Sequence, residues 1–408
     1  MELFFIILCF IFLVANSWGA FGDTLGNEVP ISDLYNAALN YTIDMDYQAR
    51  ALSLIPAVKH NKQSERHGFL CSTYIRWSQS SLEILANNIK FTSTFCDWLI
   101  VVYNSQDRTN FEMESQLERK LEEMHHTKSK SITILTAPVK DEAIQVFQVL
   151  CQKYVDKNIH EEFVKEAENP CQILNDVELS VYNAALYSKA SLIILALEYL
   201  SNYKYIWVLD GDIDLTQLDL KRFAEIIFCS FRRPPIITQP LIHENTQFYR
   251  YLHRSSWKNS KVIATAVGFI EIQAPIFDTI FLEWFTLSFL LPLVPAMTIL
   301  GGDWGIDEMF CTAAKEFSQA GKMGNYHEAL NCMVPIDDLA VNHKNEGEIA
   351  NTIGLERKRE INFALMKIVH KYFWKFAHDG LRYYNDPFNR GAKYKKVYQL
   401  QKNCSAAF

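Results

Sequence analysis

The run YIWVLDGDID, from Tyr205 to Asp214, constrains this chain more than any other stretch. Its β-forming residues stop abruptly at three carboxylates spaced two apart, of which Asp210 and Asp212 are the first two. A short apolar run bounded by turn residues is typical of a strand buried on both faces of a parallel sheet. Ligands of such sheets bind outside the carboxyl ends of the strands. The sequence therefore predicts the edge of a site at the end of this strand.

The loop Asp210-Gly211-Asp212 offers two carboxylates separated by one small residue. Such carboxylates can turn the same way and share a divalent cation through their oxygens. Asp and Gly are also ordinary turn residues, so a polar turn without a metal is the competing interpretation. The spacing alone leaves both interpretations open.

Strand-like and helix-like segments alternate ahead of this loop, with apolar runs at 68–75, 97–104 and 131–138. The alternation predicts βαβ units and a parallel sheet, hence an α/β half able to hold a nucleotide. Neither GxGxxG nor GxxxxGK[ST] follows these strands, which argues against dinucleotide-cofactor and P-loop sites. An apolar helix is predicted over 183–200, and its one cation, Lys189, either covers apolar surface with its stem or contacts a phosphate.

Beyond the loop, 231–240 is predicted as a short strand and 262–278 as a longer one. The apolar stretch 284–300 contains Pro292 and Pro295, so we expect a buried helix ending in a loop rather than a membrane span. From residue 349 onward, helical patterns and a basic tail predict an extension that packs outside the core.

A second acidic motif follows in GGDWGIDEMF. Asp307 and Glu308 stand at the predicted start of a helix, where acids also suit the helix dipole. Trp304 lies between turn glycines, and exposure of its indole ring to solvent is unfavourable unless another group stacks on it. A strand-like segment over 334–345 then carries His343 at its end, and we expect His343 to lie within metal-ligand reach of the Asp212 side chain.

Length, composition and net charge limit the domain organisation and the classes of binding partner. The chain has 408 residues, 49% of them hydrophobic, which is enough for one large domain with extensions. Its net charge is −7, and it has no basic run of the kind that would suggest a nucleic-acid footprint. No nucleic-acid partner is therefore expected, and a nucleotide would bind as a small molecule.

The N-terminus predicts a signal peptide over 1–19. An apolar stretch from Leu3 to Ala15 precedes small residues and is shorter than the roughly 20 residues that span a bilayer. Because Glu2 stands where a basic residue is usual, a short uncleaved Golgi-type anchor is the alternative. The cysteines lack CxxC pairs and suit disulfides, and acceptor triplets at Asn40 and Asn403 suit a lumenal protein.

Two chemistries compete for these carboxylates. A haloacid-dehalogenase-like phosphatase would use Asp210 as nucleophile and Asp212 as general acid. Thr238, either Lys258 or Lys261, and the GDxxxD run from Gly302 to Asp307 would complete its motifs. That motif normally opens its domain, whereas about three strands precede it here, and Asp214 stands where Thr or Val is usual.

The other chemistry is sugar transfer from a nucleotide diphosphate. It needs a metal at the leaving diphosphate, a carboxylate that takes the acceptor proton and an aromatic face for the acceptor sugar. The chain supplies a DxD loop, then an acid pair, then His343, in that order.

The ordered motifs YKYIWVLDGDI, IITQP, GFIEIQAPIFD, DWGIDEMFC and VPIDDLAVNH resemble the eukaryotic domain-of-unknown-function 707 family, whose members are similar to GT-A-fold glycosyltransferases. The resemblance runs from Phe69 to Asn345. It implies a nucleotide-sugar site on the first half, with Asp210 and Asp212 as its DxD and His343 as a further metal ligand.

The WGID run also resembles the WG-x-acid-acid motif of galactosyl- and N-acetylgalactosaminyl-transferases. This implies Asp307 or Glu308 as catalytic base, with Trp304 and Gly305 in the acceptor subsite. The chain departs from that motif at Ile306, where those enzymes often carry glycine.

We therefore expect an α/β, GT-A-like fold, a mostly parallel central sheet flanked by helices, with a leader over 20–62, a catalytic domain over 63–345 and a helical extension over 346–408. The expected function is a metal-dependent hexosyl- or N-acetylhexosaminyl-transferase of the secretory lumen. The expected cofactor is Mn²⁺, or Mg²⁺, and the expected donor is a nucleotide sugar. The residues predicted to bind the donor are Asp210, Gly211, Asp212 and Lys189. A glycan, glycoprotein or lipid would be the acceptor, and a non-catalytic carbohydrate-binding protein is the remaining alternative.

Overall fold

A computed structural model describes residues 35–36, 68–103, 110–124, 131–136, 149, 152–153, 189–230, 234–243, 261–300, 302–303, 305–320, 331–337, 339–344, 355–372, 396–397 and 399. The expected signal peptide, nearly all of the leader, both glycosylation triplets and Trp304 lie outside these residues.

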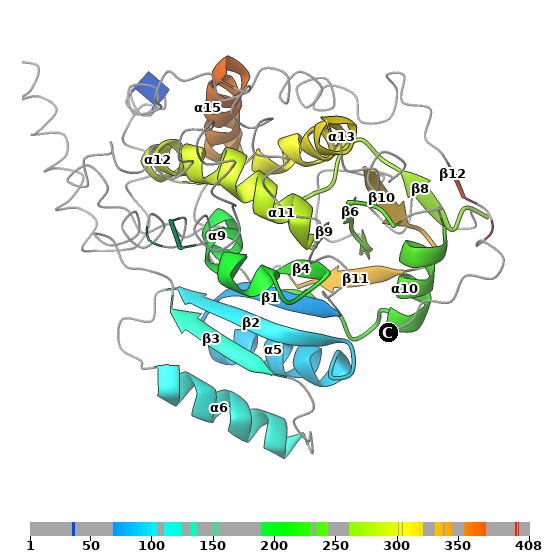
Figure 1. The fold of residues 1–408 in the computed structure, drawn as a ribbon. Coiled ribbons are helices and arrows are strands. Elements are labelled where there is room, and N and C mark those ends of the chain that lie inside the picture. The colour runs from blue at the N-terminus through cyan, green and yellow to red at the C-terminus, as the bar shows by residue number, and fades with distance from the viewer. Residues whose placement is uncertain are drawn as a thin grey trace, which may run out of the picture.

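A nine-stranded sheet forms the centre of the molecule, in the order β12-β8-β10-β6-β9-β4-β1-β2-β3 (Figure 1). Its strands are β1 (Phe69–Arg76), β2 (Cys96–Tyr103), β3 (Ile132–Thr136), β4 (Tyr205–Asp210), β6 (Ile237–Thr238), β8 (Ala264–Ala266), β9 (Ile276–Asp278), β10 (Cys332–Pro335) and β12 (Lys396–Val397). Only β8 and β9 run against the other seven, so the expected mostly parallel sheet is confirmed.

Helices cover both faces of this sheet (Figure 1). They are α5 (Gln79–Phe91), α6 (Asn110–Glu123), α9 (Lys189–Leu200), α10 (Leu220–Cys229), α11 (Thr279–Phe285), the π-helical η7 (Thr286–Leu290), α12 (Leu291–Leu300), the 3-10 helix η8 (Ile306–Met309), α13 (Phe310–Ala320) and α15 (Leu355–Tyr372). One apolar core joins α9, α11, α12, α13 and α15 to the sheet, and a second joins α5, α6 and α10 to its other face.

Strand β4 is buried on both faces, as its sequence predicts. Ile206 and Val208 belong to the core beneath α9, whereas Trp207 and Leu209 belong to the core beneath α5. It pairs in parallel with β1, and this register sets Asp210 beside Tyr74 at the carboxyl end. The sheet therefore delivers the DxD loop to the edge where ligands of parallel sheets bind.

A smaller three-stranded sheet continues from this edge, in the order β5 (Ile213–Asp214), β11 (Ala340–His343) and β7 (Leu241–Ile242). Its register sets His343 opposite Ile213, directly after the DxD loop. Asn88 of α5 holds the same strand, because its side chain donates to the Ile213 carbonyl at 2.7 Å and accepts from the Leu215 N–H at 2.9 Å. Strand pairing thus carries a distant histidine to the loop.

Three segments differ from their predictions. The run 262–278 forms two short strands, β8 and β9, that pair with different neighbours, so 267–275 leaves the sheet. The segment 334–345 is likewise shared between β10 and β11. The apolar helix does not end at its prolines: the wider π turn of η7 precedes Pro292, which lacks an N–H, and α12 continues to Leu300.

Helix α15 packs inside the main core, not outside it as predicted. Ile361, Leu365, Ile368 and Val369 are buried in the same apolar cluster as α9 and α12. Helical periodicity indicated the helix, but its partner α12 comes from a distant part of the chain. The predicted catalytic domain ended at residue 345 and so excluded α15. The packing of α15 against α12 argues against that limit.

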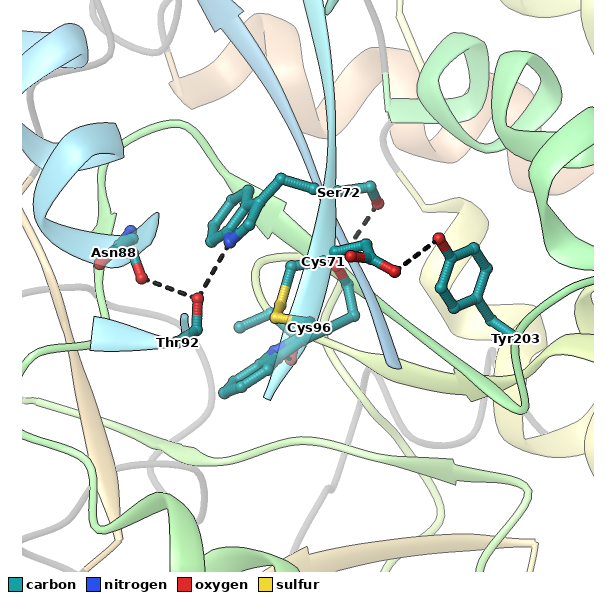
Figure 2. Close-up of a disulfide and its surroundings, with 10 residues drawn as sticks. Cys71, Ser72, Asn88, Thr92, Cys96 and Tyr203 are labelled. Carbon is teal, nitrogen blue, oxygen red and sulfur yellow. Dashed lines mark hydrogen bonds between the residues drawn. A yellow bond between two sulfur atoms is a disulfide. The ribbon is translucent and has the colours of Figure 1, made fainter. Parts of the chain in front are cut away.

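Two disulfides join neighbouring elements. Cys71–Cys96 links the starts of β1 and β2 (Figure 2), and Cys311–Cys332 links α13 to β10. Cys229 is disulfide-bonded as well. Such bonds fit an oxidising secretory lumen. Among the described helices, none has the length and apolar character required to cross a membrane.

Candidate active site

The DxD loop begins at Asp210, the last residue of β4, and turns at Gly211. A Cβ atom at Gly211 would lie 2.6 Å from Cγ2 of Ile75 and 3.1 Å from the Tyr74 carbonyl oxygen. No larger residue fits there without displacing β1. Close packing against the end of β1 therefore requires glycine between the two carboxylates, and no donor contact needs to be invoked to explain it.

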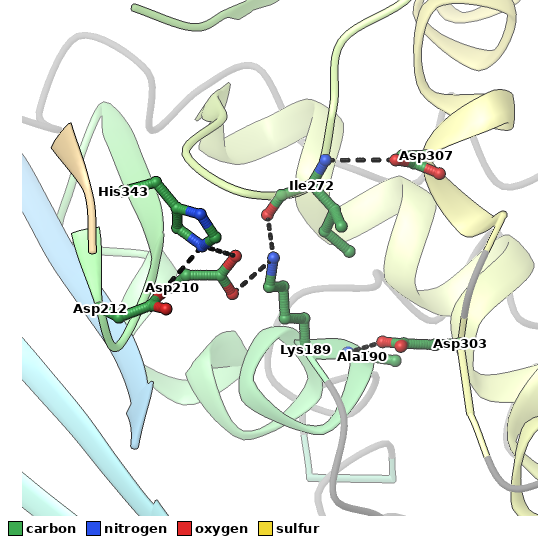
Figure 3. A network of polar contacts seen from close by, with 8 residues as sticks. All are labelled: Lys189, Ala190, Asp210, Asp212, Ile272, Asp303, Asp307 and His343. Carbon is green, nitrogen blue, oxygen red and sulfur yellow. Dashed lines mark hydrogen bonds and ion pairs between the residues drawn. The ribbon is translucent and has the colours of Figure 1, made fainter. Parts of the chain in front are cut away.

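His343 lies beside both aspartates (Figure 3). Its Nε2 is 3.1 Å from Asp212 Oδ1 and 4.0 Å from Asp210 Oδ2. One ligand atom from each of the three residues lies within 4.8 Å of the others. The expected proximity of His343 to Asp212 is confirmed, and it comes from the pairing of β11 with β5.

This group of three could hold a divalent cation. Carboxylate oxygens suit Mg²⁺, Ca²⁺ and Mn²⁺, and a single imidazole is accepted most readily by the transition metal among them. Nε2 of His343 faces the carboxylates, whereas its buried Nδ1 has no partner among the described residues. The donor set therefore fits a cation held through Nε2 and two carboxylates.

Lys189 approaches the same carboxylates from the first described residue of α9. Its Nζ lies 2.6 Å from Asp210 Oδ1 and donates to the Ile272 carbonyl at 2.7 Å (Figure 3). Asp303 holds the helix start, because its Oδ2 accepts from the N–H of Ala190 at 3.0 Å. The stem of Lys189 does not simply cover apolar surface; its charge is directed into the site.

Charges within the site shift the pKa values of its members. Burial raises the pKa of Asp210, although the charge of Lys189 opposes it. Burial also acts to raise the pKa of Asp212, but the hydrogen bond from His343 and the charges of His343 and Lys189 together outweigh it, so the pKa is lowered. Burial disfavours the His343 cation, but the hydrogen bond to Asp212 and the negative charges of Asp212 and Asp210 together raise the pKa of the imidazole. Metal binding here would displace a proton from His343.

The second acid motif divides into two environments. Asp307 is partly exposed, and its Oδ2 accepts from the N–H of Ile272 at 3.3 Å. Because Lys189 donates to the carbonyl of the same residue, the backbone of Ile272 lies between Asp307 and the Lys189–Asp210 pair (Figure 3). Burial raises the pKa of Asp307 to about 6 despite the hydrogen bond from Ile272.

Glu308 points elsewhere. It is 5% exposed, and its Oε1 accepts from Nδ2 of Asn362 in α15 at 3.2 Å. Its Oε2 has no partner among the described residues. Burial first, and the charge of Asp307 second, raise the pKa of Glu308 to about 8. Two adjacent acids that the sequence could not rank thus occupy different settings.

Glu271 is a site residue that the sequence interpretation missed. Burial, followed by the negative charge of Asp307, raises its pKa to about 8, and its charge also interacts with those of Lys189, Asp210 and His343. Its backbone N–H donates to Oε1 of the fully buried Gln239 at 2.9 Å. The signal was present in GFIEIQ, a single acid inside an apolar run.

The third aspartate of the opening run, Asp214, does not join the group. Its Oδ1 accepts from the N–H and Oγ1 of Thr216, and its Oδ2 lies 3.2 Å from Nζ of Lys344. Burial acts to raise the pKa of Asp214, but these hydrogen bonds outweigh it and the pKa is lowered. Asp214 therefore fixes the exit of the loop.

The phosphatase interpretation gains no support from its threonine and lysines. Thr238 is buried in β6, Lys261 is exposed, and Lys258 lies outside the described residues. The cation that contacts Asp210 is Lys189, from ahead of the strand.

Comparisons with known proteins add little to this geometry. No family model matches the chain, and no curated protein matches it either. Membership of the domain-of-unknown-function 707 family therefore stays a prediction. Among solved structures, the chain is similar to mannosyltransferase PcManGT from Pyrobaculum calidifontis, in complex with GDP-Man and Mn²⁺. The two chains are 11% identical, the match covers 86% of this chain and 85% of that chain, and the TM-score is 0.33.

Proposed function

We propose that this protein is a metal-dependent glycosyltransferase that takes a sugar from a nucleotide-sugar donor. The observation that carries the proposal is the convergence of Asp210, Asp212 and His343, with ligand atoms within 4.8 Å of one another, at the carboxyl end of a parallel strand. Two further features support the proposal: Lys189 pairs with Asp210, and Asp307 is a separate, partly exposed acid.

In the proposed reaction, separate residues bind the metal and the donor phosphate. Asp212 and His343 hold the cation, Mn²⁺ in preference to Mg²⁺, and Asp210 completes the set. When bound, the cation supplies neutralising charge for the departing diphosphate. Lys189, which pairs with Asp210 across 2.6 Å, can exchange that partner for a donor phosphate oxygen.

Asp307 is our candidate for the group that takes the proton from the acceptor hydroxyl. Its pKa of about 6 leaves it ionised near neutral pH and still basic enough to accept a proton. Glu308 is buried and held by α15, which argues against the same role for it. Trp304 and Gly305 belong with Asp307 in the proposed acceptor subsite, for a hexosyl or N-acetylhexosaminyl transfer to a glycan, glycoprotein or lipid.

We place the reaction in the lumen of the secretory pathway, or outside the cell. The support is the N-terminal apolar stretch followed by small residues, together with two disulfides in the described part of the chain. A GT-A-like arrangement is proposed on the strength of the mixed sheet with its metal-ligand group at the carboxyl edge.

The test is donor binding and slow donor hydrolysis with a panel of UDP-, GDP- and CMP-sugars, with and without Mn²⁺. We expect one donor to bind and hydrolyse only with the metal, and Asp212→Asn to lose both properties. The matched control is Asp214→Asn, which removes a carboxylate of the same loop outside the metal-ligand group.

Each of two results would contradict this proposal and favour a different function. Release of phosphate from p-nitrophenyl phosphate, lost in Asp210→Asn, would favour the phosphatase. Glycan binding without metal-dependent donor binding would favour a non-catalytic carbohydrate-binding protein.

A further inference from the structure

Asn362 of α15 contacts the turn that carries the acid pair. Its Nδ2 donates to Oε1 of Glu308 at 3.2 Å. Its Oδ1 lies only 2.6 Å from the point where a Cβ atom on Gly305 would stand, and its Cγ lies 2.9 Å from that point. Both ends of one amide group therefore meet the 305–308 turn.

Gly305 has two reasons to be glycine at this turn. Its φ of +98° lies in the left-handed region, which side-chain-bearing residues rarely adopt. Its missing Cβ also leaves the space that the Asn362 amide occupies. The Glu308 N–H donates to the Gly305 carbonyl at 3.1 Å and closes the turn. The turn and the amide are thus fitted to each other.

The helix that presents Asn362 is anchored in the core. Ile361 and Leu365, on either side of it, are 2% and 0% exposed, whereas the next residue, Phe363, is 58% exposed. Helix α15 also contacts α12 along the same apolar cluster. The position of Asn362 is therefore fixed by the core packing of α15, and the 305–308 turn packs against it.

Glu308 has the environment of a neutral anchor. It is 5% exposed and accepts one hydrogen bond, from Asn362, while Oε2 has no partner among the described residues. An ionised carboxylate with so little compensation would be costly. Consistently, burial raises the pKa of Glu308 to about 8.

We propose that Asn362 is a positioning residue, which holds the 305–308 turn through Glu308 and Gly305 so that Asp307 is presented on the side of Ile272. The C-terminal helix is thereby part of the site. The inference rests on the proposed function only where it gives Asp307 a role in sugar transfer; the mechanical link between α15 and the turn stands without it.

Hydrogen–deuterium exchange tests the link without any substrate. In Asn362→Ala, amides of 305–310 should exchange about tenfold faster than in wild type, because loss of one hydrogen bond to a buried carboxyl loosens the turn. Amides of 205–213 should keep their rates. The control is Phe363→Ala, which removes the exposed neighbouring side chain. Equal rates in Asn362→Ala and wild type, or a uniform rise throughout the protein, would overturn the proposal.

Kinetics test the consequence, using the nucleotide sugar of the panel that wild type hydrolyses fastest with Mn²⁺. We expect Asn362→Ala to lower kcat about tenfold while leaving the donor dissociation constant unchanged. The exchanged pair Glu308→Gln with Asn362→Asp restores an amide–carboxyl hydrogen bond in reverse and should recover most of that loss. Weaker donor binding, or no recovery in the exchanged pair, would contradict a positioning role.

The two proposals fail separately. A wild-type protein that binds no nucleotide sugar would end the proposed function, and the exchange experiment would still decide the role of Asn362.

Discussion

At the scale of single residues, Asp307 and Glu308 are neighbours in sequence with opposite surroundings. Asp307 is partly exposed and bonded to the Ile272 backbone, whereas Glu308 is buried against Asn362. We predict that Asp307→Asn lowers donor hydrolysis by more than about 100-fold, as loss of a general base does. Glu308→Gln, which mimics a neutral carboxyl, should cost far less. Hydrolysis rates at saturating Mn²⁺ check this, and a larger loss in Glu308→Gln would exchange the two roles.

Two acids with raised pKa values also make stability depend on pH. The pKa values of Glu271 and Glu308 are raised to about 8 from 4.5, so between pH 4.5 and 8 the native state holds protons that the unfolded chain releases. The free energy of unfolding should therefore fall as pH rises through this window. Urea titrations at pH 5 and pH 8 measure the difference. Glu308→Gln should remove at most about 1.4 kcal/mol of it per pH unit.

A suitable control for the pH experiment is Glu83→Gln on α5. Glu83 is exposed and the hydrogen bond from Gln79, followed by the charge of Lys120, lowers its pKa, so its titration falls below the window. A pH dependence that is the same in wild type and Glu308→Gln would show that Glu308 is ionised in the native protein.

Part of the residue-level site was predictable from local pattern. The DxD loop comes at the end of an apolar strand, so parallel-sheet geometry predicts that its acids lie at the carboxyl edge. His343 reaches the loop in another way, through the antiparallel pairing of β11 with β5 in the smaller sheet, which local pattern does not predict. Glu271 and Asn362 were not predictable in the same way. Their significance comes from partners such as Asp307 and Glu308 that only tertiary packing supplies.

At the scale of elements, the carboxyl ends of β1 and β4 decide the shape of the DxD loop. Gly211→Ala would bring its Cβ within 2.6 Å of Cγ2 of Ile75. We predict a loss of about 1–3 kcal/mol in the free energy of unfolding, the usual cost of overpacking. Ile75→Ala removes the clashing methyl, so in a double-mutant cycle the two changes should couple favourably. Strictly additive losses would show that β1 does not confine the loop.

Element boundaries were harder to predict than element types. The run 262–278 has the composition of one strand, but β8 and β9 pair with different neighbours, and the 267–275 segment between them carries Glu271 and Ile272 into the site. An apolar run in the sequence predicts that a segment is buried, but it does not predict which strand or helix packs against that segment. The continuation of the apolar helix through Pro292 was missed for a different reason, since proline usually interrupts a helix and here the π turn of η7 precedes it.

At the scale of the whole molecule, the C-terminal helix belongs to the fold. Ile361, Leu365, Ile368 and Val369 of α15 are buried in the core shared with α9 and α12. We predict that a chain ending at residue 345, the predicted domain limit, unfolds at much lower urea concentration than the full chain, because each lost core side chain contributes about 1.5–3 kcal/mol. A chain ending at 372 keeps α15 and is the control. Equal midpoints for the two truncated chains would restore an independent 63–345 domain.

The central claim is that Asp210, Asp212 and His343 form one metal site, and direct Mn²⁺ binding tests it most closely. Isothermal titration of the full chain with MnCl₂ should show one site in wild type and in Asp214→Asn. We expect binding more than about tenfold weaker in Asp212→Asn and in His343→Ala, since loss of a ligand costs at least as much as loss of its supporting contacts. Equal Mn²⁺ affinity in wild type and both ligand variants would contradict the account.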